Sequence, residues 1–353
     1  MSIAINGTNG ITYNDGSLQP SAPVGQNLII NGNMMIDQRN TTQTGNGYSV
    51  DRWAIFDNTS ATYTLAQDSS APTGFINSLK FTTTGTDTSI GSTEQCVIYH
   101  QIEGYNIADL NWGTANAKTV TLSFYVRSSL TGTFAGSLGN NGYARSYPFT
   151  YTISSADTWE QKTITITGDT TGTWLTTNGV GISLRLAIAA GSSFEATAGA
   201  WASGNYFSVS GATNVVGTAS STFYITGVQL EANTAATPFE NLQYGQQLAR
   251  CQRYYIKITD PAACGVAAGG NSARNSIFLP VTMRANPSVL ASGTFSFYNG
   301  AATRTGTAAG YYPGISAQVI QVDFTLSSAF TTGQAVTLYT NNGSQFISSD
   351  AEL

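Results

Sequence analysis

The feature that most constrains the fold of this chain is a repeated alternation of apolar and polar residues over short segments. Between residues 180 and 188 every second side chain is apolar, and similar alternation occupies residues 119–126, 161–167 and 221–230. A period of two places successive side chains on opposite faces of a β-strand, so each segment has one apolar face. Asn-Gly pairs, which favour tight hairpin turns, recur along the chain. We therefore expect an all-β chain of antiparallel strands arranged as a sandwich or jelly roll.

One segment has a different period. Residues 242–254 place Tyr244, Leu248 and Cys251 at intervals of three and four, which is typical of one face of a helix. Asn241 is a suitable N-cap for that helix. The helix separates two β-rich blocks and so predicts the domain organisation. We expect an N-terminal extended arm (1–26), a jelly-roll or β-sandwich domain (27–240), a short connecting helix (241–255) and a smaller C-terminal β-sandwich domain (256–353).

The composition excludes several classes of partner. Charged residues make up 9% of the 353 residues, and the formal net charge is −5. Nucleic-acid-binding surfaces normally show clustered Lys and Arg, and no window of this chain has such a cluster. No apolar run approaches the roughly 18 residues of a transmembrane helix, and the N-terminus lacks the pattern of a secretion signal. The three cysteines are too scattered for a disulfide framework. We expect no nucleic-acid partner, no membrane insertion and folding in a reducing cytoplasm.

Candidate catalytic groups are few. His100 is the single histidine, and no Gly-x-Ser-x-Gly motif is present to supply a nucleophile. One histidine and three dispersed cysteines give no zinc-ligand pattern. Two carboxylate pairs remain, Asp157 with Glu160 and Glu231 with Glu240, because glycoside hydrolysis needs two carboxyl groups about 5–10 Å apart. Neither pair has a distinguishing context, so we expect no enzymatic activity and no catalytic metal.

Aromatic residues in turn-rich segments indicate a binding function. A sugar presents C–H faces and hydroxyl groups, which proteins bind with flat aromatic rings and a few polar groups. Tyr143, Arg145 and Tyr147 follow a strand break, and an extended segment would project all three to one side. Two further clusters contain Trp201 with Tyr206, and residues 310–314. We expect glycan to bind at the first cluster, with Trp201 and Tyr206 as the next candidates. The alternative is that these rings pack against neighbouring strands or another subunit.

Several strings of the sequence resemble bacteriophage tail-fibre and other virion appendage proteins. These strings are Asn27–Arg39 with Asp51–Trp53, Phe223–Glu231 with Ala236–Glu240, Cys251–Tyr255, Pro280–Pro287 and the opening Ala4–Tyr13. The resemblance spans nearly the whole chain. It implies a jelly roll similar to carbohydrate-binding modules, on a trimeric structural protein of a virion.

The resemblance also implies partners and a location. It implies a homotrimer in the virion, assembled in the host cytoplasm, with the N-terminal arm attached to other virion proteins and a host-surface polysaccharide as receptor. Jelly rolls of this kind often hold a structural Ca²⁺, for which Asp37, Asp51 and Asp57 are scattered candidates without an EF-hand loop. We expect no cofactor, with that Ca²⁺ as the alternative.

Two other functions stay open at this point. One is a capsid- or tail-mounted decoration protein that uses the fold without recognising glycan. The other is a polysaccharide depolymerase, which would need one of the carboxylate pairs.

Overall fold

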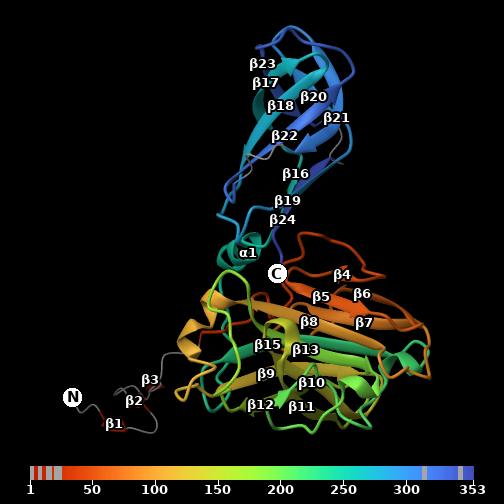
Figure 1. Cartoon of the computed structure of the whole chain (residues 1–353), viewed down its shortest axis with the longest axis vertical. Coiled ribbons are helices and arrows are strands. Elements are labelled where there is room, and N and C mark those ends of the chain that lie inside the picture. Colours follow the sequence, from red (N-terminus) through yellow and green to blue (C-terminus); the bar gives the residue numbers. More distant parts are fainter. Residues whose placement is uncertain (1–3, 7–9, 13–17, 20–25, 312–315, 341–344) are drawn as a thin grey trace. The chain divides into compact units, whose positions relative to one another are not determined.

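The computed structural model describes residues 26–311, 316–340 and 345–353, together with 4–6, 10–12 and 18–19. Strands dominate these residues, which contain one α-helix (Figure 1), so the expected all-β class is confirmed. The chain forms two compact units, residues 1–243 and 244–353. Each unit is described in turn.

The first unit is a sandwich of two antiparallel sheets (Figure 1). The seven-stranded sheet contains, in spatial order, β14 (Ala202–Ser203), β11 (Arg145–Ile153), β10 (Gly132–Gly139), β13 (Val180–Ala190), β8 (Gln95–Glu103), β5 (Trp53–Asp57) and β4 (Gly47–Tyr48). The five-stranded sheet contains β12 (Glu160–Ile166), β9 (Val120–Ser128), β15 (Thr222–Glu231), β7 (Ser78–Gly85) and β6 (Thr62–Asp68). Short 3-10 helices lie between strands at Gly104–Asn106 (η1), Ala108–Leu110 (η2), Asn141–Tyr143 (η3), Ser192–Phe194 (η4) and Val215–Gly217 (η5).

Apolar side chains from the two sheets interdigitate to form the core. Phe124 of β9 lies edge-on to Tyr151 of β11, with ring centres 5.1 Å apart. Phe134 of β10 stacks on Phe223 of β15 at 6.0 Å. Burying a large apolar side chain of this kind contributes roughly 1.5–3 kcal/mol to folding. The alternation seen in the sequence therefore stabilises the sandwich because it gives each sheet one inward apolar face.

A buried polar side chain ties the start of the sandwich to its last strand. Asn27 Nδ2 donates to the carbonyl of Val228 (3.0 Å), while its Oδ1 accepts from the backbone N–H groups of Ile29 (2.9 Å) and Leu230 (3.0 Å). Asn27 thus satisfies buried backbone groups that water cannot reach. Two strings that carry the resemblance meet at this contact.

A second asparagine holds the following loop. Asn31 Nδ2 donates to the carbonyls of Ile36 (2.8 Å) and Asp51 (3.0 Å), and its Oδ1 accepts from the N–H of Ile36 (2.9 Å). The indole of Trp53, which is fully buried, donates to the Asn31 carbonyl at 3.1 Å. The segment from Asn31 to Trp53 is therefore held in place by these hydrogen bonds, and it has a structural role at the edge of the sandwich.

The second unit begins with α1 (Tyr244–Gln252) and continues as strands. A three-stranded sheet contains β16 (Tyr255–Thr259), β24 (Phe346–Asp350) and β19 (Ser288–Ser292). A closed barrel contains β17 (Ala263–Gly269), β18 (Ser272–Phe278), β22 (Val319–Leu326), β21 (Thr303–Tyr311), β20 (Phe295–Tyr298) and β23 (Ala335–Tyr339). We expected a β-sandwich here; six of the strands instead close into a barrel, and closure leaves that sheet without an unpaired strand edge.

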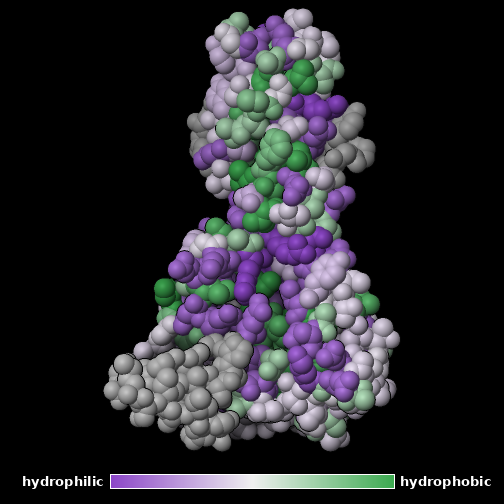
Figure 2. Space-filling view, turned by 90° about the vertical axis from the view of Figure 1, so that its left-hand side faces the viewer, coloured by the Kyte–Doolittle hydropathy of each residue, from purple (hydrophilic) through white to green (hydrophobic). Residues whose placement is uncertain are grey.

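The second unit also exposes large apolar side chains. Phe278 is 79% exposed and Leu290 is 56% exposed. Figure 2 shows hydrophobic residues gathered on the face of this unit that is turned to the viewer. Contiguous exposed apolar surface is commonly covered by a partner in the assembled protein.

The N-terminal arm lies largely outside the described residues. Its described parts, β1 (Ala4–Asn6), β2 (Gly10–Thr12) and β3 (Leu18–Gln19), form a small antiparallel sheet. Among the described residues, no helix is long and apolar enough to cross a membrane.

The predicted elements can be compared with those observed. The strands expected at 119–126, 161–167, 180–188 and 221–230 are β9, β12, β13 and β15, and the helix expected at 242–254 is α1. These predictions are confirmed, with ends that differ by at most two residues. The compact units divide at residue 243, which places α1 in the second unit.

Candidate functional site

The outward surface of the seven-stranded sheet carries a compact group of polar and aromatic side chains. Leu184 and Leu186 of β13 point into the core, so Ser183 and Arg185 point outward. Strand pairing places Ser137 and Tyr99 on either side of Arg185, and Gly139 and Gln101 on either side of Ser183. Three loop residues, Tyr143, Asn205 and Tyr206, reach the same surface through their contacts with Arg185. We call Ser137, Ser183, Arg185, Tyr99, Gln101, Tyr143, Asn205 and Tyr206 the Arg185 face.

Arg185 lies at the centre of this face and is 2% exposed. Its Nε donates to Ser137 Oγ (3.1 Å), its Nη2 to the Tyr206 carbonyl (3.0 Å) and its Nη1 to Asn205 Oδ1. The guanidinium carbon stacks 4.2 Å from the centre of the Tyr143 ring. Burial lowers the pKa of Arg185 to about 10, which leaves the side chain cationic at neutral pH. Its hydrogen-bond acceptors are all uncharged, and no carboxylate of the described residues forms an ion pair with it.

The loop that supplies Asn205 and Tyr206 is fixed to the sheet by Ser146 of β11. Ser146 Oγ donates to the Gly204 carbonyl (2.6 Å) and accepts from the Tyr206 N–H (3.1 Å). Gly204 has a φ of 140°, and a Cβ there would lie 2.6 Å from the Tyr206 ring. The loop therefore requires glycine at this position in order to place Tyr206 on the face.

Two buried polar atoms of the face have no hydrogen-bond partner among the residues that the structure describes. They are Ser183 Oγ and Gln101 Oε1, on side chains that lie directly opposite each other in the β13–β8 pair. Ser183 is fully buried. An unsatisfied buried polar group costs about 1–3 kcal/mol, so such a pair needs an explanation beyond packing.

Four tyrosine rings lie half-buried on or beside the face: Tyr48, Tyr99, Tyr143 and Tyr206. Tyr48 of β4 continues the row past Tyr99, with ring centres 6.4 Å apart in an edge-on arrangement. Between them on β5 stands only the small side chain of Ala54. The surface thus combines flat apolar rings with hydroxyl, amide and guanidinium groups, the combination that sugar recognition uses.

The structure separates the three residues of the first predicted cluster. Residues 140–145 form a tight hairpin connection, in which Gly142 and Tyr143 both have left-handed backbone angles (φ 73° and 56°). Tyr143 consequently turns over the outward face, whereas Tyr147, in β11, points into the core and is 7% exposed. The expectation that Tyr143, Arg145 and Tyr147 share one exposed side is wrong, because the segment is a hairpin and not an extended loop.

Arg145 is committed to an ion pair. Its Nε and Nη2 donate to the two carboxylate oxygens of Asp169 at 2.7 and 2.8 Å, and its Nη1 donates to Ser203 Oγ at 3.2 Å. Asp169 is 2% exposed. Burial raises the pKa of Asp169, but hydrogen bonds from Arg145 and Thr171 outweigh that effect and hold the pKa below its usual value. Arg145 therefore stabilises the hairpin rather than offering its guanidinium to a ligand.

Trp201 belongs to a cluster of aromatic rings. Its ring centre lies 5.3 Å from those of Trp112, Trp174 and Tyr147, each in an edge-on arrangement, and its indole N–H donates to the Thr167 carbonyl at 2.7 Å. Edge-on contacts and a satisfied indole N–H are typical of structural packing. Among the predicted residues, only Tyr143 and Tyr206 are brought together on the Arg185 face. The cluster at residues 310–314 lies almost entirely outside the described residues.

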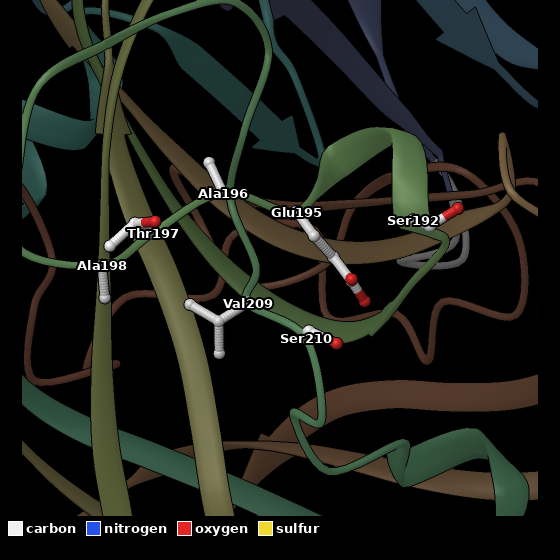
Figure 3. A pocket seen from close by; sticks show the side chains of 7 residues that line it. All are labelled: Ser192, Glu195, Ala196, Thr197, Ala198, Val209 and Ser210. Carbon is white, nitrogen blue, oxygen red and sulfur yellow. The ribbon is translucent and has the colours of Figure 1, made fainter.

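An open hollow of about 370 Å³ lies beside the segment that follows β13. Its lining consists of Ser192, Glu195, Ala196, Thr197, Ala198, Val209 and Ser210. Figure 3 shows the Glu195 carboxylate extending toward Ser210, next to Val209. Glu195 is the single carboxylate of this lining, whereas glycoside hydrolysis needs two.

The titratable groups considered for catalysis all have structural contacts. His100 is fully buried; its Nε2 bonds to the Ile30 carbonyl (3.0 Å), and burial together with the Arg52 charge lowers its pKa well below the usual value. Asp157 and Glu160 form ion pairs with neighbouring cations, at 3.6 and 2.6 Å. Glu231 and Glu240 accept hydrogen bonds from backbone N–H groups.

The candidates for a Ca²⁺ site are likewise engaged elsewhere. Asp37, Asp51 and Asp57 accept hydrogen bonds from the backbone N–H groups of Asn40, Gln38 and Thr59, respectively. In the part of the chain that the structure describes, no three His, Cys, Asp or Glu side chains form a group able to hold a metal ion.

Sequence reasoning missed the centre of the Arg185 face. The apolar positions of β13 predicted the strand from the sequence. Arg185 is the single arginine among the alternating residues of that strand, and it was the signal in the sequence that could have pointed to the face. Tyr99 and Gln101 likewise alternate with apolar residues of β8. Their convergence with Arg185 depends on strand pairing, which the sequence does not display.

Comparisons with known proteins gave likeness of fold only. No family model and no curated protein matched the sequence. Among solved structures, a proposed sugar-binding protein from Bacteroides thetaiotaomicron is 11% identical, with a TM-score of 0.34 over 59% of this chain and 100% of that chain. A family 11 carbohydrate-binding module from Clostridium thermocellum, in complex with a mixed-linked tetrasaccharide, is 12% identical, with a TM-score of 0.29 over 52% of this chain and 91% of that chain.

A phage protein is also among the similar structures. The enzymatically active domain of tailspike protein 4 from bacteriophage CBA120 is 11% identical, with a TM-score of 0.32 over 61% of this chain and 24% of that chain. The likeness thus involves about a quarter of the tailspike domain. At these identities and scores the similarities concern the β fold alone.

Proposed function

We propose that this protein is a non-catalytic, glycan-binding structural protein of a bacteriophage virion, and that the Arg185 face is its binding surface. The observation that carries the proposal is the arrangement on the outward surface of the seven-stranded sheet. Half-buried tyrosine rings lie there beside buried polar atoms that have no hydrogen-bond partner among the described residues. Rings bind the C–H faces of a sugar, and the polar atoms bind its hydroxyl groups.

The position of these groups favours binding without a large rearrangement. Tyr99, Gln101, Ser183 and Arg185 lie on the paired strands β8 and β13, so the sheet fixes their spacing. Preorganised groups reduce the entropy lost when a ligand binds. A single face should bind a short oligosaccharide weakly, near a millimolar dissociation constant, or roughly −4 kcal/mol. Several copies on one particle would raise the effective affinity through avidity.

The virion part of the proposal rests on the strings of sequence that resemble phage appendage proteins. In the structure, two of these strings meet at Asn27 and Leu230, where they close the sandwich. A homotrimer with closed symmetry is the assembly that the resemblance implies, and the exposed Phe278 and Leu290 are suited to subunit contacts. The N-terminal arm is the proposed attachment to other virion proteins. Light scattering on the full chain tests the trimer, and a monomer at micromolar concentration would contradict it.

A glycan array with matched variants tests the binding function. Tyr99→Ala should abolish binding of the glycans that the wild-type chain binds on the array, because it removes the ring that lies next to Arg185 across the strand pair. Tyr125→Ala is the control, since Tyr125 is also a half-buried strand tyrosine but belongs to β9 of the other sheet. Absence of binding to any host-derived glycan would favour the decoration protein, and release of shorter sugars from host polysaccharide would favour the depolymerase.

A further inference from the structure

Three partly buried arginines among the described residues each form an ion pair with an aspartate. Arg145 pairs with Asp169, Arg274 with Asp323, and Arg127 with Asp157, at 2.7, 2.7 and 3.6 Å. Arg185 is more deeply buried than any of these three and has no carboxylate partner among the described residues. A buried charge without a counter-charge is costly, so proteins normally pair it.

The guanidinium also retains hydrogen-bonding capacity. An arginine side chain has five N–H donors, and the protein occupies three of those on Arg185, one on each nitrogen. One N–H on Nη1 and one on Nη2 are therefore without a partner in the described residues. Two such donors on a planar guanidinium match the two oxygens of a carboxylate, which arginine commonly binds in a bidentate manner.

Neighbouring atoms suit the remainder of an acidic sugar. Ser183 lies two positions before Arg185 on the same strand, and Gln101 lies opposite Ser183. Within the described part of the chain, neither the buried Ser183 hydroxyl nor the buried Gln101 amide oxygen has a hydrogen-bond partner. A hydroxyl group of the sugar can donate to Gln101 and accept from Ser183. Two rings cover the guanidinium: Tyr143, on an exposed hairpin turn, lies 4.2 Å from the guanidinium carbon, and the buried Phe207 lies 5.1 Å from it. Of the two, the Tyr143 ring is the one that can rotate without disturbing the core.

We propose that the Arg185 face selects glycans that contain carboxylate-bearing sugars, with Arg185 as the counter-charge of the carboxylate. This inference rests on the proposed function, because it names the class of glycan that the same face binds. The chain's net charge of −5 does not attract an anionic polymer, so the selection depends on the local donors.

Paired polysaccharides test this inference independently of the host. The probes are polygalacturonate, alginate, hyaluronan and polysialic acid, each compared with its carboxyl-reduced form in affinity electrophoresis and calorimetry on the full chain. We expect at least one acidic polymer to bind ten times or more tightly than its reduced form. Arg185→Gln should remove that preference, whereas Arg127→Gln, on the other sheet, should keep it.

A second variant keeps the test informative if Arg185→Gln fails to fold. Asn205→Asp places a carboxylate at the atom that already accepts from Arg185 Nη1. It should preserve folding and raise the melting temperature, and it should abolish the preference because the counter-charge then comes from the protein. If Arg185 is only structural, Asn205→Asp would leave binding unchanged.

The outcomes separate the two proposals. Equal binding of acidic and reduced forms, lost in Tyr99→Ala, would overturn the acidic selection and leave glycan binding in place. A preference that survives in Asn205→Asp would also overturn it. Binding of none of these polymers, together with none of the glycans on the array, would overturn the proposed function itself.

Discussion

The guanidinium carbon of Arg185 lies 4.2 Å from the centre of the Tyr143 ring. This contact connects the central strand β13 to the hairpin turn that contains Tyr143. A cation stacked on a ring contributes about 0.5–2 kcal/mol, depending on its exposure. The contact explains why Tyr143, although it lies on an exposed turn, is half-buried. It also places the ring beside the polar atoms to which we assign glycan recognition.

The two tyrosines of the hairpin should therefore respond differently to truncation. Tyr143→Ala should lower the free energy of unfolding by about 1 kcal/mol, since it loses one cation–π contact on the surface. Tyr147→Ala should lower it by about 3 kcal/mol or more, since it empties a core position beside Trp201. Urea unfolding of both variants measures the difference. Equal losses of stability would contradict the placement of the two rings on opposite faces.

The ion pair between Arg145 and Asp169 predicts a pH-dependent stability. Removing one partner of a buried pair leaves an uncompensated charge, so Asp169→Asn should cost about 3 kcal/mol at pH 7. The lowered pKa of Asp169 means that its carboxylate stabilises the fold above the ordinary aspartate value near 3.9, and that this contribution is lost as the pH falls through the lowered value. The difference in the free energy of unfolding between Asp169→Asn and the wild type should therefore become smaller only below about pH 4.

Chemical denaturation at several pH values measures that difference. Asp109→Asn is a suitable control, because its ion pair with Lys118 is exposed and such pairs contribute little. If the difference in the free energy of unfolding between Asp169→Asn and the wild type disappeared between pH 5 and 7, a group other than Asp169 would be titrating.

The single histidine allows a second pH experiment. Because the pKa of buried His100 is well below its usual value, only the unfolded chain takes up a proton there just below pH 6.5. The free energy of unfolding should then fall by about 1.4 kcal/mol for each pH unit below 6.5, until the carboxylates begin to titrate. His100→Gln should remove that slope between pH 5 and 6.5, because glutamine keeps a donor for the Ile30 carbonyl and does not titrate.

A slope that persists in His100→Gln would mean that the buried imidazole is not its source. Binding of glycan by this variant should match the wild type, because His100 points into the core whereas the Arg185 face points outward.

The sequence predicted what depends on neighbouring residues and missed what depends on strand pairing. Alternation predicted β13 and its inward leucines, because a period of two is a local property. It could not place Tyr99 and Ser137 beside Arg185, because two strands far apart in sequence bring those residues there. Tyr147 was misassigned for a related reason: two left-handed residues turn the chain back, and the hairpin register then directs Tyr147 inward.

The last prediction concerns Asn27, the first residue of the segment Asn27–Arg39 at the start of the sandwich. Asn27→Ala leaves the N–H groups of Ile29 and Leu230 and the carbonyl of Val228 without their side-chain partner, all in a buried environment. Each unsatisfied buried group costs about 1–3 kcal/mol, so we expect a loss of at least 3 kcal/mol in the free energy of unfolding.

Asn46 supplies the matched control for that variant. It forms a similar pair of hydrogen bonds, with the backbone N–H (2.6 Å) and carbonyl (3.1 Å) of Asp57, but it is exposed. Water can replace those bonds, so Asn46→Ala should cost about 0.5 kcal/mol or less. Urea unfolding of both variants provides the comparison. If Asn27→Ala were as mild as Asn46→Ala, the string would not be what closes the sandwich, and its occurrence in the sequence would need a role outside the fold.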